Sequence, residues 1–158
     1  MWNMAPIPPI RVVAGVLSTH TKDLLIGRRC GVGREYVGCW EFPGGKVDGS
    51  VTDAEALARE WQEELGLEVM VLAPEKPLWT SGIVETPNGV QFCLTAYQIK
   101  RNNLHAPYWL RGSHSEVRWL SAGQVMYLPP AECTPSLFPI ARSLLPARDW
   151  TENLNVIY

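Results

Sequence analysis

The segment from Thr52 to Gly66 carries the marks of an amphipathic helix with two defined ends. Thr52 can act as the N-cap, and Glu55 three residues later completes a capping-box pattern. Gly66 stands where a helix usually ends on a left-handed residue. Between these ends, apolar residues at helical spacing form one stripe: Ala54, Leu57, Ala58, Trp61 and Leu65. The helix is therefore expected to pack on a core along this stripe.

Extended segments surround this helix along the chain. The Pro87-Asn88-Gly89 sequence between two of them is a strong hairpin-turn signal, and a second helix is predicted at Ser136–Leu145. Strands are expected at Arg11–Leu17, Asp23–Arg29, Leu67–Leu72, Leu78–Glu85, Val90–Ile99 and Glu116–Leu120, the first two as a hairpin or as adjacent strands. Because strands and helices mix without strict alternation, the pattern favours an α+β sandwich over a doubly wound sheet.

One side of the first helix is acidic. Glu60, Glu63 and Glu64 stand at i, i+3 and i+4, so their side chains point to one side of the helix, next to its apolar stripe. Three crowded carboxylates repel one another, and hard oxygen ligands select magnesium, manganese or calcium. The alternative is a solvated acidic face, which is the commoner situation for an arbitrary helix.

The surrounding residues favour the metal site, because the stretch from Gly45 to Leu67 resembles the Nudix box, G-x5-E-x7-R-E-U-x-E-E-x-G-U. The positions that match are Gly45, Arg59, Glu60, Trp61, Glu63, Glu64, Gly66 and Leu67. The resemblance implies the Nudix fold, a mixed β-sheet sandwiched between α-helices (α/β/α sandwich), in a single domain spanning residues 1–158. It also implies that Gly45, Glu60, Glu63 and Glu64 hold Mg²⁺, with Mn²⁺ as a possible substitute, and that water attacks a phosphorus atom of a diphosphate linkage.

One box position departs from the pattern. The first glutamate should fall at residue 51, where this chain has Val51. In the family that glutamate supports the site rather than holding the metal, so a weakened network around Arg59 is expected, with Asp48 and Asp53 close enough in sequence to substitute in part. If Val51 has only replaced a supporting carboxylate, Val51→Glu should leave activity similar or improved.

The general base is left open by the sequence. In relatives it is a box glutamate, here Glu60 or Glu63, or a glutamate six residues before a tryptophan on a later loop. Counting back from Trp119 gives Ser113 instead. Glu116 and His114 are the nearby alternatives, although Glu116 is also well placed to form an ion pair with Arg118 or a neighbouring strand.

The substrate class follows from a finer resemblance. The run from Trp40 to Lys46, preceded by Arg28 and Arg29, looks like the MutT and CTP pyrophosphohydrolase branch, which converts nucleoside triphosphates to the monophosphate and pyrophosphate. The resemblance implies that an arginine of this pair approaches the phosphates, that Phe42 lines the base pocket and that Glu132 reads the base edge. An ionised carboxylate accepts hydrogen bonds from the cytosine amine, so (d)CTP, modified cytosine nucleotides and 8-oxo-dGTP are the expected substrates.

Two other functions remain open. Val51 and Ser113 also suit a non-catalytic Nudix module that binds a nucleotide or a protein partner, but such a module has no need for Glu60, Glu63 and Glu64 together. The second open function is that of a Nudix enzyme for a different nucleoside-diphosphate-linked substrate, such as a nucleotide sugar, a dinucleoside polyphosphate or capped RNA.

Composition sets the remaining expectations. The 158 residues suit one domain, with an N-terminal arm at 1–10 and a C-terminal tail at 147–158. A net charge of −2 predicts no duplex nucleic acid partner, and no apolar run is long enough to cross a membrane. The start of the chain does not look like a secretory signal. The four scattered cysteines are expected to be free, which suggests a cytoplasmic protein whose oligomeric state stays open.

Overall fold

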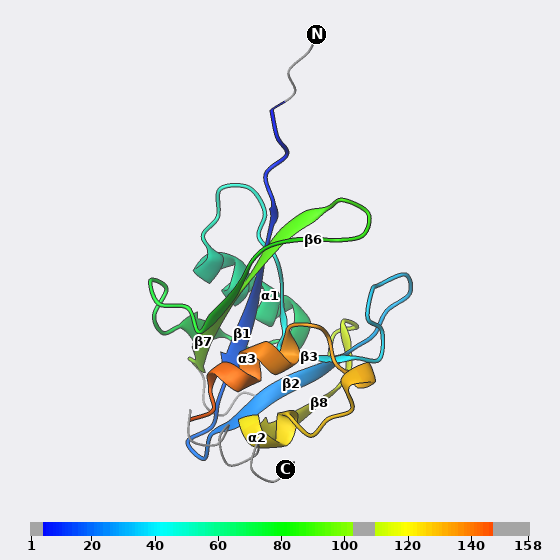
Figure 1. Cartoon of the computed structure of the whole chain (residues 1–158). Coiled ribbons are helices and arrows are strands. Elements are labelled where there is room, and N and C mark those ends of the chain that lie inside the picture. The colour runs from blue at the N-terminus through cyan, green and yellow to red at the C-terminus, as the bar shows by residue number, and fades with distance from the viewer. Residues whose placement is uncertain (1–4, 103–109, 147–158) are drawn as a thin grey trace.

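The computed structural model describes residues 5–102 and 110–146, and it shows curved strands with helices on two sides (Figure 1). The predicted tail at 147–158 lies outside these residues. The elements are β1 (Ile10–Leu17), β2 (Asp23–Arg29), β3 (Trp40–Glu41), β4 (Gly44–Lys46), α1 (Asp53–Leu65), β5 (Val69–Val71), β6 (Trp79–Glu85), β7 (Gln91–Arg101), β8 (His114–Ser121), α2 (Ala122–Val125), the 3-10 helix η1 (Pro130–Glu132) and α3 (Leu137–Ser143).

The strands form two sheets. In the five-stranded sheet the order is β4-β1-β7-β5, with β6 also paired to β7, and the three-stranded sheet has the order β3-β2-β8. β1 and β7 run parallel while the other pairs are antiparallel, so the first sheet is mixed, as expected. The five-stranded sheet and the helices together confirm the α+β class.

The first two strands, expected as a hairpin or as adjacent strands, lie in different sheets and meet only at the turn that joins them. β1 pairs with β7 along one edge and with β4 along the other. Because both edges of β1 are occupied, β2 meets it only through an isolated bridge between Ser18 and Leu24 and continues into the second sheet.

Two apolar clusters lie on opposite faces of the strands. Alternate residues of β1 point to different clusters: Val13 belongs to the cluster under α1, and Ala14 to the cluster under α2 and α3. In the same way, Leu25 and Ile26 of β2 lie in different clusters. This burial of both faces explains the continuous apolar runs in β1 and β2, and it confirms the predicted sandwich of strands between helices.

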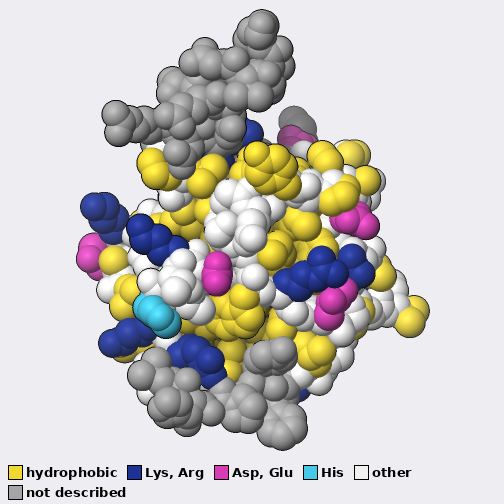
Figure 2. Space-filling model, turned by 90° about the horizontal axis from the view of Figure 1, so that it is seen from below, with side chains coloured by type: hydrophobic (Ala, Val, Ile, Leu, Met, Phe, Trp, Pro, Cys, Tyr) yellow, Lys and Arg dark blue, Asp and Glu magenta, His cyan; other side chains and the backbone are white. Residues whose placement is uncertain are grey.

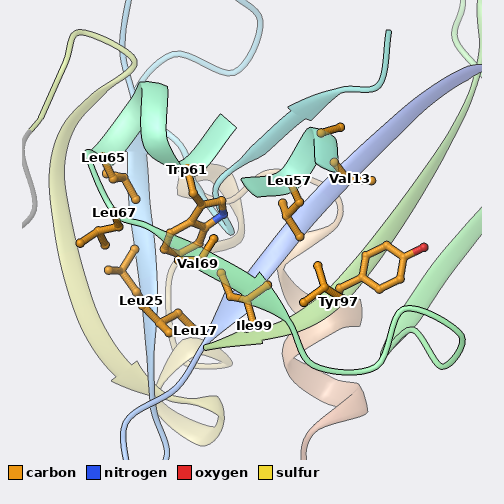
Figure 3. Close-up of a cluster of buried hydrophobic side chains, with 12 residues drawn as sticks. Val13, Leu17, Leu25, Leu57, Trp61, Leu65, Leu67, Val69, Tyr97 and Ile99 are labelled. Carbon is orange, nitrogen blue, oxygen red and sulfur yellow. The ribbon is translucent and has the colours of Figure 1, made fainter. Parts of the chain in front are cut away.

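Helix α1 begins and ends as predicted. The Thr52 hydroxyl accepts a hydrogen bond from the Glu55 backbone N–H at 3.2 Å, and Gly66 is left-handed with φ of 65°. Trp61 is fully buried among the side chains of the first cluster (Figure 3), and its indole Nε1 donates to the Pro43 carbonyl at 2.9 Å. A Cβ at Gly15 would lie 2.6 Å from that Nε1, so β1 needs a glycine where the indole crosses it.

The other predicted strands and the second predicted helix are present with shifted ends, whereas the short strands β3 and β4 and the 3-10 helix η1 were not predicted. The β6–β7 hairpin closes through hydrogen bonds from Thr86 N to Val90 O and from Gly89 N to Thr86 O, at 2.8 and 2.9 Å. α3 is shorter than its predicted range. The sequence reading missed the short helix α2, although Ser121 and Gln124 form a complete capping box at its start. No helix in the described part of the chain is long and apolar enough to cross a membrane.

Candidate metal and nucleotide site

The predicted carboxylates gather where α1 passes the β3–β4 segment. Glu60 lies against Gly45: a Cβ at that glycine would fall 2.5 Å from the Glu60 carboxyl carbon. Burial raises the pKa of Glu60, and the neighbouring charge of Glu63 raises it further. Glu63 is exposed, so its carboxylate remains in contact with solvent. The helical spacing thus brings Glu60 close to Glu63, and the packing of β4 against α1 brings Glu60 close to Gly45.

Glu64 is the most perturbed acid of the site. Burial raises its pKa to about 8, with further contributions from the charges of Glu41 and Glu60. Its Oε2 atom is buried and has no hydrogen-bond partner among the residues that the structure describes. An orphaned carboxylate oxygen is costly, and a cation removes the cost of both the burial and the repulsion.

The donor set fits the Mg²⁺ that the box implies. Carboxylates and a glycine carbonyl are hard oxygen ligands. Within residues 5–102 and 110–146, no three acidic, histidine or cysteine side chains come together closely enough to hold a metal ion by themselves. Magnesium sites usually combine one or two carboxylates with waters and substrate phosphates.

Of the two acidic residues expected near Arg59, Asp48 is the one that lies beside it. Its Oδ2 lies 3.6 Å from Arg59 Nη2, which is also 3.7 Å from Glu60 Oε1. Val51 is half-buried and packs against the first apolar cluster. Asp53, the other candidate, binds Arg11 and accepts a hydrogen bond from the Tyr97 hydroxyl at 2.6 Å. That hydroxyl points away from the rest of the cluster (Figure 3).

A second polar group, which includes a residue that the sequence reading missed, lies on the α1 side of the three-stranded sheet. Arg29 Nη1 donates to both Glu41 oxygens, at 2.7 and 3.1 Å. His114 Nε2 lies 3.4 Å from Glu41 Oε2, and its Nδ1 lies 3.1 Å from Ser113 Oγ. Glu41 had a sequence signal, because it alternates with the apolar Trp40 and Phe42 and must face the other way.

The remaining candidates from β2 and β8, Arg28 and Glu116, point away from α1, to the opposite face of the three-stranded sheet. Arg28 Nη1 lies 3.0 Å from Glu116 Oε1, and Arg118 Nε lies 3.7 Å from Glu116 Oε2. Both arginines approach the Trp40 ring, at 4.8 and 4.7 Å from its centroid. Trp40 belongs to the cluster under α2 and α3, not to the cluster under α1. This arrangement favours the ion-pair interpretation of Glu116 over the catalytic one.

The two base-pocket candidates lie on the same side as Trp40. Phe42 is buried in the second cluster, and Glu132 is exposed at the end of η1. The chain just after Glu132 runs beside β3, with the Thr134 N–H donating to the Trp40 carbonyl at 3.0 Å. The Trp40 Nε1 and Thr134 Oγ1 atoms are buried, and neither has a hydrogen-bond partner within residues 5–102 and 110–146. Cys30, Cys39, Cys93 and Cys133 are free, as expected.

Comparisons with known proteins agree with this arrangement. A family model described as the NUDIX domain matches residues 8–141. The chain is 38% identical over 60 residues to an 8-oxo-dGTP diphosphatase of Proteus vulgaris, a match covering 38% of this chain and 53% of the relative. It is 42% identical over 62 residues to the CTP pyrophosphohydrolase of Escherichia coli K12, covering 39% and 44%. The chain therefore spans about half the length, or less, of these curated relatives.

The fold is shared more widely than these segments. The solution structure of the Escherichia coli ORF135 protein superposes with a TM-score of 0.67 at 24% identity, covering 88% of this chain and 92% of that one. At this identity the likeness shows the fold alone. Because the family model spans residues 8–141, which is most of the chain, the chain belongs to the NUDIX domain family.

Proposed function

We propose that this chain is a Mg²⁺-dependent nucleoside triphosphate pyrophosphohydrolase that forms the nucleoside monophosphate and pyrophosphate. The similarity to an 8-oxo-dGTP diphosphatase and a CTP pyrophosphohydrolase supports the reaction class. The observation that carries the proposal is the buried Glu64 oxygen, which has no hydrogen-bond partner among the described residues, one helical turn from the Glu60 carboxylate that lies against Gly45. Such a group of oxygen donors has a physical need for a divalent cation, which a merely structural acidic face does not have.

The roles proposed for the box residues follow from how exposed their side chains are. Glu60, Glu63, Glu64 and the Gly45 carbonyl would hold the cation, which would neutralise phosphate oxygens and lower the pKa of a bound water. Arg59 keeps the Glu60 carboxylate in place from 3.7 Å. Glu63, the exposed box glutamate, accepts the proton of the attacking water. The water oxygen bonds to one phosphorus of the α–β anhydride linkage, that anhydride bond breaks, and its electron pair leaves with the group on the other side, so that the products are the nucleoside monophosphate and pyrophosphate.

The proposed base pocket lies on the other face of the strands, beside Phe42 and Glu132. The exposed Glu132 carboxylate is free to accept hydrogen bonds from a base, and the resemblance assigns it that role. Arg29 already binds Glu41 and the Glu35 carbonyl, and Arg28 binds Glu116. A phosphate contact from either arginine therefore has to compete with these partners.

The charge distribution on the described surface suits a small nucleotide better than duplex nucleic acid. Seen from below, the described surface carries apolar side chains with separate small groups of basic and acidic ones, rather than one continuous basic area (Figure 2). The net charge of −2 agrees with that view. The absence of a duplex nucleic acid partner stays a prediction.

The test is a panel of nucleotides incubated with the purified chain, with Mg²⁺, with Mn²⁺ and with a chelator. CTP, dCTP, a modified dCTP and 8-oxo-dGTP are expected to give monophosphate and pyrophosphate only when a cation is present. UTP and dTTP are the expected poor substrates. Glu64→Gln, assayed in parallel, should lose activity by about a hundredfold or more, because it removes a ligand charge.

Other outcomes would redirect the assignment. Cleavage confined to nucleotide sugars, dinucleoside polyphosphates or capped RNA would keep the chemistry and replace the substrate. Nucleotide binding without cleavage of any substrate would support the non-catalytic module. The structure weakens one motive for that module, because Asp48 lies near Arg59 despite the loss of the first box glutamate.

A further inference from the structure

Three strands place one polar group on the α1 side of the smaller sheet. Arg29 comes from β2, Glu41 from β3 and His114 from β8, and the register pairs Arg29 with His114 across the β2–β8 ladder. Both neighbours contact the Glu41 carboxylate: Arg29 Nη1 lies 2.7 Å from Oε1, and His114 Nε2 lies 3.4 Å from Oε2. The mechanism above uses neither Glu41 nor His114.

The path of the β3–β4 segment directs Glu41 toward the cation site. Trp40 and Phe42 point into the second cluster, so Glu41 between them points to the α1 side. Two residues further on, the Pro43 carbonyl accepts the Trp61 indole N–H, and Gly45 lies against Glu60. The segment thus runs along α1, and it places the Glu41 side chain on the side of the strands that α1 covers.

His114 is built into this arrangement rather than lying there by chance. Its side chain is 0% exposed, while that of Glu41 is 12% exposed. A Cβ at Gly27 would lie 2.6 Å from the imidazole, so β2 leaves room for the ring. With Ser113 at Nδ1 and Glu41 near Nε2, both ring nitrogens have partners. A buried ring with two directed contacts fixes the group that it touches.

We propose that Glu41, fixed by Arg29 and His114, is a positioning carboxylate for the divalent cation held by Glu60, Glu63 and Glu64. Its negative charge, on the α1 side of the strands, strengthens cation binding, and its two partners keep the carboxylate from turning away. Arg29, which is bonded to Glu41, offsets part of that charge. The proposal rests on the proposed function for the identity of the site. It concerns cation binding, which can be measured without a nucleotide.

The first experiment measures Mn²⁺ binding to the full chain by electron paramagnetic resonance of the free ion, with no nucleotide present. Glu41→Gln keeps the shape of the side chain and removes its charge, and is expected to weaken Mn²⁺ binding roughly tenfold to a hundredfold. Glu85→Gln, at an exposed position on β6, is the control for losing one negative charge and should bind as the wild type does. Glu41→Gln binding Mn²⁺ like the wild type would overturn the proposal.

The second experiment separates positioning from a merely structural role of His114. His114→Leu should weaken Mn²⁺ binding, and His114→Gln, which retains an amide N–H donor, should restore most of it. Because His114 acts through Glu41, adding His114→Leu to Glu41→Gln should cause little further loss. Additive losses, or no rescue by glutamine, would overturn the role of His114. Thermal unfolding of each variant checks that it is folded.

The two proposals fail in different ways. A wild type that binds Mn²⁺ and hydrolyses no nucleotide contradicts the proposed function and leaves the role of Glu41 intact. A wild type that hydrolyses nucleotides, with unchanged Mn²⁺ affinity in Glu41→Gln, contradicts only the role of Glu41. A wild type without measurable Mn²⁺ binding contradicts both.

Discussion

The Glu60 carboxylate lies against the backbone of Gly45 at the point where β4 passes α1. Any side chain at residue 45 would occupy the space of that carboxylate, since its Cβ would come within 2.5 Å of the carboxyl carbon. The clash would involve the far end of a flexible side chain, so the protein can relieve it by moving Glu60. A substitution here should therefore disturb the cation site more than the fold.

Gly45→Ala is expected to weaken Mn²⁺ binding and turnover on the order of tenfold or more, because it displaces a metal ligand. The melting temperature should change by only a few degrees, since no core contact is lost. Gly123→Ala in α2 is the matched control: the nearest atom to its added Cβ is Ser121 Oγ, at 3.9 Å. A large loss of stability in Gly45→Ala, with unchanged Mn²⁺ affinity, would contradict this view.

The Glu64 carboxyl predicts how the stability of the cation-free protein depends on pH. Burial, Glu41 and Glu60 raise its folded pKa to about 8, from an ordinary value of 4.5. The folded state then binds the proton more tightly than the unfolded state between these values. Stability should consequently fall as pH rises from about 4.5 to about 8 and level off above, by on the order of a few kcal/mol.

Urea unfolding in a chelator at pH 5, 6, 7 and 8 measures this dependence. Glu64→Gln should flatten it and raise stability near pH 8, because the amide carries no charge to desolvate. Saturating Mg²⁺ should do the same for the wild type by neutralising the carboxylate. An equally steep pH dependence in Glu64→Gln would assign it to another group.

Val51→Glu tests the departure from the box. The sequence alone predicts similar or improved activity, but Val51 packs on the first cluster and Asp48 already lies by Arg59. We therefore expect a loss of about 1 kcal/mol or more in unfolding free energy, because a charge enters a half-buried apolar site, and no gain in turnover. Thermal unfolding and kcat/KM are compared with those of Val51→Ala. Improved kcat/KM in Val51→Glu would show that the loop accommodates the carboxylate.

Glu132→Gln tests base selection. The amide both donates and accepts hydrogen bonds, so the variant should lose part of its preference for cytosine nucleotides and gain relative activity on UTP and dTTP. The measurement is kcat/KM across CTP, dCTP, 8-oxo-dGTP, UTP and dTTP for both proteins. If all values move together or none moves, Glu132 does not read the base and is better explained as a charge before α3.

Predictions that concern a single helix or turn could be made from local sequence patterns. The spacing of Glu60, Glu63 and Glu64 places them on one side of α1 whatever surrounds it, because the helix repeats every 3.6 residues. Thr52 and Gly66 marked its ends for the same local reason, and Asn88-Gly89 marked the β6–β7 turn. These features depend on backbone geometry within a few residues, which a sequence displays directly.

Contacts between distant strands were beyond such patterns. The separation of β1 from β2 depends on β4 and β7 occupying both edges of β1. The pairing of Glu116 with Arg28 depends on the β2–β8 register, since a shift of one residue would turn that side chain to the α1 side. Sequence spacing carries no information about either choice.

The sequence by itself determined that this chain has a Nudix helix with three box glutamates, a glycine at residue 45 and a mixed α+β fold. Only the tertiary structure decided that Asp48 and not Asp53 lies beside Arg59, and that Glu41 meets Arg29 and His114 near Glu64. The physical reason is the range of the interactions. Helix periodicity and caps act within one element, whereas these polar contacts form only after strands far apart in the chain have paired in one register.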